Sequence, residues 1–459
     1  MSTFDYVLQV TDQTSGTVTL TTSPFSVKDW AVRVGSDEDK TVTESCEIRL
    51  TDGSVAANLA EARALQDLLQ QAKDAQRNRA ISPVYAVWKE NASGTIYRSE
   101  IKDGRVEWDS EALQYSQWIG DTQFARVYWE RSNWWEGPEA QLGLSNPHGT
   151  VTTAAGTVYN HNAGGTCNYL DIAGTAVLGD IPGATRLELT NSYYSAVSGL
   201  YGTIIYGLDH VWIGQNVFTP STFDHIIEAE TSDYGGTAIA GAYSGGSVIR
   251  TGVTSTSETL LLAWALPTAV ADAANGRLHR LTFRSTTMES ANVIRYRLKL
   301  VFGTAAAGVA LWQSDLVTPD SSFVLSTRNL FTLKLPPWPP GLSGATGLYL
   351  QLWGMKVGSD NQLLNIDFIQ LTPADGYREL KTASYDVPYE YRIIDDGIGE
   401  YLYVDDGAGA DKAGIMTGYG APIQVWPGRD QRLYFLMNPD EIARTLSVKV
   451  FYRPRRRTL

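Results

Sequence analysis

Cysteine is scarce in this chain: its 459 residues contain only Cys46 and Cys167. Two cysteines so far apart in the sequence do not indicate a disulfide framework. The first residues, MSTFDYVLQV, contain no basic region followed by an apolar run, so we expect no signal peptide and synthesis in a cytoplasm. Long apolar stretches are also lacking. None approaches the length that spans a bilayer, so we expect no membrane insertion.

Positive charge is in deficit, with 37 Lys and Arg against 50 Asp and Glu and a formal net charge of −13. A general nucleic-acid binder needs a basic footprint, so we expect no nucleic-acid partner. The exception is the C-terminal run RPRRR, which contains Arg455, Arg456 and Arg457. This run is either a solvated tail or a segment that docks onto an acidic neighbour. The second alternative makes the three arginines candidates for assembly.

Catalytic motifs are lacking as well. The sequence contains no H-E-x-x-H, G-x-x-x-x-G-K-[ST], G-x-S-x-G or C-x-x-C pattern, and its five histidines show no metal-ligand spacing. We therefore expect that the protein is not an enzyme and requires no cofactor. A polysaccharide-degrading enzyme stays open as an alternative, because the spacing of a catalytic carboxylate pair is spatial and is not visible in a sequence.

The residues that are plentiful are those of β-sandwiches. The chain contains 42 Gly, 13 Trp and 24 Tyr, and 43% of its residues are hydrophobic. Aromatic and β-branched residues favour strands, whereas glycine favours turns. We therefore predict a mainly β protein. It consists of an α+β assembly module with one long helix, plus one or more inserted β-sandwich or jelly-roll domains.

One segment, residues 55–80, has the pattern of a long amphipathic helix. Its apolar residues recur every three or four positions, with charged and amide residues between them. The stripe consists of Leu59, Ala62, Leu65, Leu69 and Ala72. It faces either a sheet of its own subunit or the next copy in an oligomer, and Leu59, Leu65 and Leu69 are therefore assembly candidates.

Changes of pattern along the chain predict four segments. Residues 1–135 read as the α+β module, and 136–224 as a Gly/Thr-rich linker and β region that is either separate or part of the sandwich. Residues 225–372 contain about nine strands and read as a jelly roll. Residues 373–459 read as a C-terminal β block, which we expect to pack with the N-terminal module.

An acidic pattern frames the expected jelly roll. The sequence I-E-A-E at 227–230 opens it, and I-D-F-I at 366–369 closes it. Strand alternation places Glu228 and Glu230 on the same side of their strand. Asp367, on a neighbouring strand, would complete an oxygen cluster of the kind that Ca²⁺ prefers. The alternative is that the two glutamates are simply exposed at the edge of a strand.

This framing resembles the β-jelly-roll carbohydrate-binding modules that are attached to many glycoside hydrolases. The resemblance covers about 225–372 and implies that Glu228, Glu230 and Asp367 hold a structural calcium. Sugar sites in such modules use aromatic platforms, for which the candidates are Trp264, Trp312, Trp338 and Trp353. Of these we predict Trp338, in a proline-rich loop, and Trp312 as glycan-binding residues. The alternative is that these side chains belong to the core.

The two ends of the chain resemble a different group of proteins. The N-terminal strands, the LAEARALQDLLQQA helix, the PVYAVW and YRSEIKDGRVEW pair and the terminal PIQVWPGRDQRLYF and SVKVFYRPR stretches resemble tail-tip and tube-associated proteins of long-tailed bacteriophages. In distal tail proteins, an N-terminal β-module with one helix forms a ring around the tail axis. An outer sandwich-like domain, often akin to carbohydrate-binding modules, projects from that ring.

This second resemblance implies a structural virion protein of a phage tail, in a distal-tail, tail-tip or baseplate position. The expected partners are further copies of the chain in a ring, neighbouring tail proteins and host cell-surface polysaccharide. The alternative function is that of a free carbohydrate-binding protein, in which the jelly roll is active and the ends are accessory.

Overall fold

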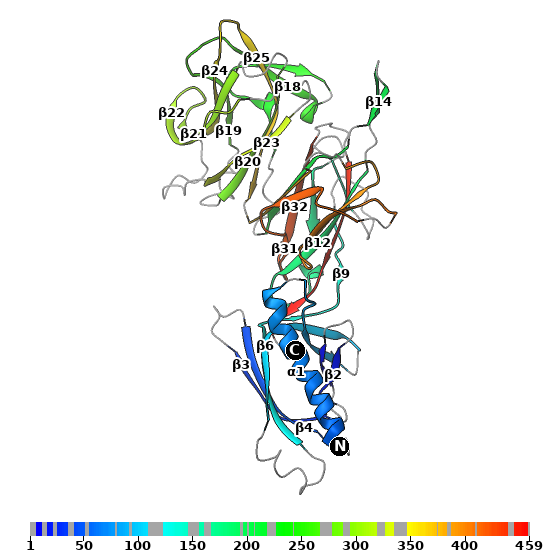
Figure 1. Cartoon of the computed structure of the whole chain (residues 1–459). Helices are drawn as coiled ribbons and strands as arrows, with labels where there is room; N and C mark the ends of the chain where they lie inside the picture. The colour runs from blue at the N-terminus through cyan, green and yellow to red at the C-terminus, as the bar shows by residue number, and fades with distance from the viewer. Residues whose placement is uncertain are drawn as a thin grey trace. The chain divides into compact units, whose positions relative to one another are not determined.

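The computed structural model describes most of the chain, in a series of segments. These are residues 6–11, 16–21, 25–34, 41–50, 55–78, 80–90, 94–108, 123–145, 156–159, 167–192, 196–199, 202–205, 207–217, 226–241, 243–266, 278–287, 294–318, 326–334, 347–373, 375–382, 387–408, 411–438 and 445–457. The prediction of a mainly β protein is confirmed, because strands dominate and α1 is the single α-helix among these residues (Figure 1). No helix in this part of the chain is both long and apolar enough to cross a membrane.

The chain divides into two compact units. The terminal unit comprises Met1–Ala140, Gly179–Ile181 and Arg453–Leu459, and the inserted unit comprises Gln141–Leu178 and Pro182–Tyr452. Both ends of the chain therefore belong to the same unit, and the inserted unit is built from the residues between them.

The terminal unit is an antiparallel sheet with α1 (Val55–Arg77) packed on it. The sheet runs in the order β2 (Thr17–Thr19), β1 (Tyr6–Thr11), β5 (Tyr85–Glu90), β6 (Ile96–Trp108), β7 (Gln123–Ser132), β4 (Thr41–Leu50) and β3 (Phe25–Val34). Two short strands, β8 (Trp135–Glu136) and β34 (Arg455–Arg456), pair at its side.

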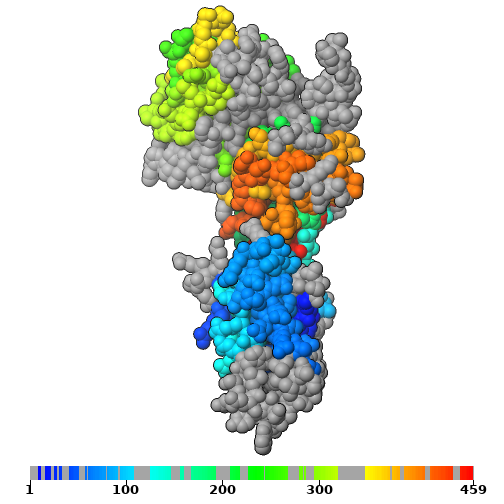
Figure 2. Space-filling view, viewed as in Figure 1, coloured from blue at the N-terminus to red at the C-terminus, as the bar shows by residue number. Residues whose placement is uncertain are grey.

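The apolar stripe of α1 faces the sheet of its own subunit. Leu65 and Leu69 are 0% and 1% exposed in a core that also contains Ile48 and Val127 of the sheet. The helix packs mainly on β6, where Gly104 gives room for the Leu69 side chain. Leu65 and Leu69 are thus core residues, and their assignment to contacts between copies is wrong. The outward side of α1 lies at the surface in Figure 2 (blue). The side chain of Leu59 lies outside the described residues.

A buried ion pair also belongs to this core. Arg131 donates from Nε to Glu44 Oε1 at 2.8 Å, and Trp129 Nε1 donates to Glu44 Oε2 at 2.9 Å. A third donor, Arg131 Nη1, bonds the carbonyl oxygen of Ser132 at 2.8 Å. Both charged side chains are at most 5% exposed. The pair is satisfied by several hydrogen bonds, as a buried charge requires.

The basic C-terminal run lies within the terminal unit. Arg455 and Arg456 pair as β34 with β8, and Arg455 Nη2 lies 2.8 Å from Glu136 Oε1. The Arg456 guanidinium lies 5.4 Å from the centre of the Tyr97 ring. Arg457 is exposed, and its backbone N–H donates to Asp180 Oδ2 at 3.3 Å. Arg455 is therefore not open for docking, because its acidic partner Glu136 is in the same subunit, and the strand pairing of Arg455 and Arg456 excludes a solvated tail for both.

The inserted unit contains a region of two sheets formed by residues before and after the jelly roll. One sheet runs in the order β10 (Gly156–Tyr159), β33 (Thr445–Tyr452), β12 (Gly183–Asn191), β27 (Arg392–Asp396), β28 (Tyr401–Asp405) and β29 (Asp411–Ala413), with β31 (Gln424–Val425) paired to β12 and β9 (Ala140–Gln141) paired to β33. The other runs in the order β11 (Tyr169–Ile172), β32 (Gln431–Asn438), β15 (His210–Asn216), β26 (Gly376–Thr382) and β30 (Met416–Tyr419). A separate hairpin joins β13 (Ala196–Gly199) and β14 (Gly202–Ile205), and a 3-10 turn, η1, covers Gly174–Ala176.

This pairing corrects the expected position of the C-terminal block. Residues 376–452 pair with strands from 156–216, not with the N-terminal module. The physical reason is the match of apolar faces: β33 alternates strictly between buried and half-buried residues and lies between β10 and β12. Only the last residues of 373–459 join the terminal unit.

The jelly roll occupies 226–373 and consists of two antiparallel sheets. One runs in the order β17 (Thr237–Ala240), β18 (Ser247–Val253), β25 (Gln362–Pro373), β20 (Leu278–Thr287) and β23 (Ser326–Lys334), with β16 (Ile226–Glu228) paired to β25. The other runs in the order β19 (Thr259–Ala265), β24 (Leu348–Lys356), β21 (Ile294–Gly303) and β22 (Gly308–Gln313). Two 3-10 turns, η2 (Ala229–Thr231) and η3 (Ser244–Gly246), lie beside β16 and β18.

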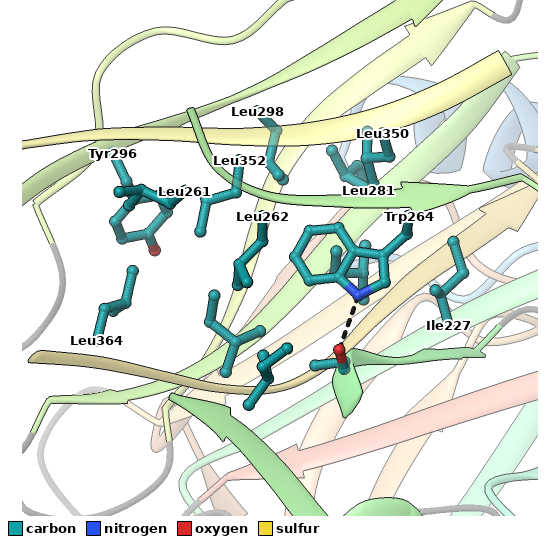
Figure 3. Packing of buried hydrophobic residues seen from close by; sticks show 14 of the residues in the cluster. Ile227, Leu261, Leu262, Trp264, Leu281, Tyr296, Leu298, Leu350, Leu352 and Leu364 are labelled. Atoms are coloured by element: carbon teal, nitrogen blue, oxygen red, sulfur yellow. Dashed lines mark hydrogen bonds between the residues drawn. The ribbon is translucent and has the colours of Figure 1, made fainter. Parts of the chain in front are cut away.

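A single apolar core joins the two sheets of the jelly roll (Figure 3). Leu298 and Leu352 from one sheet pack with Leu364 from the other. Trp264 is 1% exposed, and its Nε1 donates to the carbonyl oxygen of Ala229 at 2.8 Å. Trp264 is therefore a core residue with its one donor satisfied, and it cannot be a sugar platform.

Candidate functional site

The acidic residues at the start and the end of the jelly roll come together as the sequence predicts, but by a different local structure. β16 pairs with β25, so the first and last strands of the jelly roll lie side by side, with Glu228 opposite Phe368. β16 ends at Glu228, and Glu230 lies in η2. The expected strand alternation of Glu228 and Glu230 is wrong, because the chain turns into a 3-10 helix immediately after Glu228.

Both glutamates nevertheless reach the same point, the backbone of Gly245 in η3. A Cβ added to Gly245 would lie 2.2 Å from Glu230 Oε1 and 3.3 Å from Glu228 Cδ. Gly245 has a φ of +61°, a conformation that other residues rarely adopt. Glycine is therefore required here for two reasons, its backbone conformation and the close approach of two carboxyl groups.

Ser244 connects this pair of glutamates to Asp367. Its hydroxyl and Glu228 Oε1 are 2.9 Å apart, and its backbone N–H donates to Asp367 Oδ1 at 2.9 Å. Ser244 and Asp367 are both completely buried. Three carboxyl groups from β16, η2 and β25 thus converge on the two residues Ser244 and Gly245.

A buried arginine lies against one of these carboxyl groups. Arg284 Nε, on β20, is 3.3 Å from Asp367 Oδ2, and both side chains are 0% exposed. The Arg284 guanidinium also lies 5.3 Å from the centre of the Phe368 ring. Arg284 therefore supplies a counter-charge for Asp367.

Glu230 differs from Asp367 in the environment of its carboxyl group. Burial raises the pKa of the Glu230 carboxyl above its usual value, and a backbone hydrogen bond lowers it by a smaller amount. Glu230 Oε2 is buried and accepts no hydrogen bond in the described part of the chain. Carboxylate oxygens are the preferred donors for Ca²⁺, so Glu228 and Glu230 are the residues here that could hold it.

The side-chain positions do not form a complete metal centre. Within the described residues, no group of three or more His, Cys, Asp and Glu side chains is arranged closely enough to hold an ion. Asp367 is held by Arg284 and the Ser244 N–H, so it supports the η3 backbone on which Glu228 and Glu230 converge. The calcium set of Glu228, Glu230 and Asp367 stays a prediction.

The aromatic candidates separate into three cases. Trp312 is half-buried and packs against the jelly-roll core, so its expected role as a sugar platform is not favoured by its position. Trp338 lies outside the described residues. Trp353 is half-buried on β24, and its neighbours in sequence, Leu352 and the small Gly354, place it on the side of the sheet opposite the core.

Sequence reasoning missed the residues next to Trp353. Arg297 lies directly opposite Trp353 on β21, and Lys299 Nζ lies 3.8 Å from the centre of the Trp353 ring. The signal is present in the sequence I-R-Y-R-L-K-L at 294–300, where apolar and basic residues alternate strictly. Such alternation is common in half-exposed strands, so by itself it does not mark a binding surface.

The terminal unit has a hollow of about 340 Å³. It is lined by Ala31, Arg33, Thr43, Ser45, Cys46, Glu47, Arg126 and Tyr128. Burial raises the pKa of the Cys46 thiol to about 12, and the Glu44 carboxylate adds to the shift. Cys46 is therefore a neutral core thiol and not an activated nucleophile.

Comparisons with known proteins do not assign a family. No family model matches the chain, and no curated protein matches it. Among solved structures, the chain is similar to a protein of the Gx strain of infectious bursal disease virus, with 9% identity over 70% of this chain and 79% of that one and a TM-score of 0.19. It is also similar to SGBP-B from a complex xyloglucan utilization locus of Bacteroides uniformis, with 10% identity over 64% of this chain and 95% of that one and a TM-score of 0.21. TM-scores of this size do not establish a shared fold.

Proposed function

We propose that this chain is a structural virion protein of a phage tail, in which the terminal unit assembles with further copies and the inserted unit is displayed. The observation that carries the proposal is the pairing of β34 with β8, reinforced by the Arg455–Glu136 ion pair. It joins both ends of the chain into one α+β unit and leaves the jelly roll as an insertion. This is the layout that the resemblance to distal tail proteins implies.

The contact between copies must use surfaces other than the helix stripe, which is buried. Within the described residues, β2 and β3 stand at the two ends of the sheet path in the terminal unit. An edge strand offers unpaired backbone N–H and C=O groups to another chain. Val32 on β3 is 50% exposed, which adds an apolar contact. Pairing of β3 in one copy with β2 in the next is a heterologous contact, and such a contact closes into a ring when the rotation between successive copies completes a full turn.

The oligomeric state of the purified protein tests this proposal. We expect rings in negative-stain images and a multimeric mass in light scattering. Val32→Asp should shift the mass to that of a monomer, because it places a charge in the proposed contact. The matched control is Val309→Asp, at a 68% exposed position in the jelly roll, which should leave the mass unchanged. A monomer that never associates with tail proteins at any concentration would refute the assembly function.

The second candidate function is carbohydrate binding by the jelly roll. It is favoured by one observation, the half-buried Trp353 on the outward side of the β19-β24-β21-β22 sheet. Sugar rings have apolar C–H faces that lie well on aromatic side chains. A glycan array probed with the full chain tests this function: we expect binding that Trp353→Ala removes. Trp338→Ala is the parallel test for the loop residue, and silence across diverse glycans would refute carbohydrate binding.

A further inference from the structure

The outward side of the β19-β24-β21-β22 sheet has an unusual composition. On β21, Tyr296, Leu298 and Leu300 are 0% exposed and point into the core. The residues that alternate with them, and therefore lie on the other side, are Arg295, Arg297 and Lys299. On β24 the same alternation places Tyr349 and Trp353 on that side. We call these five residues the cationic-aromatic face.

The face has an excess of positive charge. Glu258 is the acidic partner of two of the three cations: its Oε2 lies 3.1 Å from Arg297 Nε and its Oε1 lies 2.8 Å from Lys299 Nζ. Arg295 is exposed beyond this group. Among these described residues, three positive charges stand against one negative charge and make a local positive site in a chain with a net charge of −13. A positive patch on an acidic protein attracts anions and sets which ligands approach it.

Three side chains of the face, those of Arg297, Lys299 and Trp353, are held in place before any ligand arrives. Trp353 Nε1 donates to Gln351 Oε1 at 2.9 Å, and Gln351 Nε2 donates to the carbonyl oxygen of Ala305 at 3.0 Å. Lys299 Nζ lies over the Trp353 ring at 3.8 Å from its centre. The Arg297 and Lys299 side chains are only 19% and 17% exposed. Partly shielded cations attract an anion more strongly than fully hydrated ones, and little side-chain freedom remains to be lost on binding.

We infer that the cationic-aromatic face binds an acidic polysaccharide, one that carries carboxylates at intervals along its chain. Alternate residues of a strand lie about 6.8 Å apart, so the three cations form a row that suits a polymer of repeated negative charge better than one compact ion. The two arginines can bind carboxylates through paired N–H groups, and the half-buried side chains of Tyr349 and Trp353 offer apolar surface to sugar rings. Figure 2 shows β21 and β22 (yellow-green) at the surface of the jelly roll. The inference rests on the second proposed function and names its ligand class.

A single-stranded nucleic acid is the competing polyanion. Such ligands stack successive bases on open aromatic rings. Here the ammonium of Lys299 covers one side of the Trp353 ring. The net charge of −13 opposes the two polyanions alike, so the covered side of the Trp353 ring is the observation that disfavours a stacked base, and the dT20 probe below compares the two ligands directly.

The test is titration of the full chain with polygalacturonate, with dextran and a single-stranded dT20 oligonucleotide as comparison probes. We expect polygalacturonate to bind, with an affinity that falls as salt is added, and dextran and dT20 to bind at least tenfold more weakly. Arg295→Gln with Arg297→Gln should weaken polygalacturonate binding at least about tenfold, because charge-assisted hydrogen bonds are lost. The matched control is Lys449→Gln on β33, where a lysine also faces a glutamate, Glu188 at 3.9 Å, and binding should be unchanged.

Each other outcome has a defined meaning. If dextran binds as tightly as polygalacturonate, this inference is wrong while carbohydrate binding by the jelly roll stands. If neither polygalacturonate nor dextran binds, both this inference and carbohydrate binding by the jelly roll are refuted. Equal or tighter binding of dT20 would replace the polysaccharide by a nucleic acid. Arg295→Gln alone, at an exposed position, keeps the test valid if the double variant unfolds, and it should still weaken binding several-fold.

Discussion

The contact between Leu69 of α1 and Gly104 of β6 predicts a specific pattern of coupled stabilities. Leu69→Ala should cost about 2–5 kcal/mol of unfolding free energy, because Leu69 is 1% exposed and its removal leaves a cavity. Gly104→Ala should cost about 1–3 kcal/mol through overpacking, since the new Cβ would lie 2.6 Å from Leu69 Cδ2. In the double variant, the methyl group added at position 104 enters space that the Leu69 side chain has vacated. The combined cost should therefore be smaller than the sum of the two by about 1 kcal/mol.

The rescue should be partial, because the new Cβ would also lie 3.1 Å from the carbonyl oxygen of Tyr128, which neither substitution moves. Amide hydrogen exchange of peptides from α1 and β6, measured in the full chain, reports the local free energy of opening. The matched control is Leu65→Ala with Gly104→Ala. Leu65 is equally buried, but only Leu69 and Tyr128 supply the atoms nearest to the new Cβ, so these costs should add. Additive costs for Leu69→Ala with Gly104→Ala would refute the packing argument.

Three further predictions concern buried polar groups. Arg131→Met should lower the unfolding free energy by about 3–5 kcal/mol, because it leaves the Glu44 carboxylate buried without its counter-charge. Adding Glu44→Met should restore part of that stability, as measured by chemical unfolding. Equal stability of the single and double variants would contradict this prediction. Because burial raises the pKa of Glu230, the folded jelly roll should lose stability as the pH rises from about 4.5 through that raised pKa. Glu230→Gln should remove this loss, and Ca²⁺ should raise the thermal unfolding temperature of the wild type only; an equal rise in both proteins would exclude Glu230 as a ligand. Cys46 and Cys167 are at most 1% exposed, so a thiol reagent at pH 8 should label neither in the native protein and both after denaturation. Rapid native labelling of either cysteine would show that the structure around that cysteine opens.

The parts of the fold that depend on local periodicity were predictable from the sequence. The stripe in residues 55–80 predicts a helix, and the structure has α1 over Val55–Arg77. Alternation and turn residues also predicted the strands of the jelly roll. The direction in which the helix stripe faces was not predictable, because periodicity identifies an apolar face but not the surface that covers it.

The pairing of distant strands was not predictable in the same way. The strands in 376–452 could pair with any sheet that offers a matching apolar face, and they pair with strands from 156–216. Arg455 pairs with Glu136, which is 319 residues away in the sequence, and no local sequence pattern predicts such a contact. At the acidic site, Glu230 lies in the 3-10 turn η2 and not in the expected strand, but the side chains of Glu228 and Glu230 both lie next to Gly245.

The β8–β34 pairing has a consequence for the order of folding during synthesis. Glu136 leaves the ribosome long before Arg455, so the terminal unit cannot complete its sheet while the intervening residues are being made. Closing a loop of this length in an unfolded chain has a large entropic cost. The inserted unit lowers that cost if it folds first, because its compact form brings Gln141 and Tyr452 close together: Leu142, the next residue, donates its backbone N–H to the carbonyl oxygen of Val450 at 2.8 Å. In that order of folding, the inserted unit brings the two segments that form β8 and β34 close together before they pair.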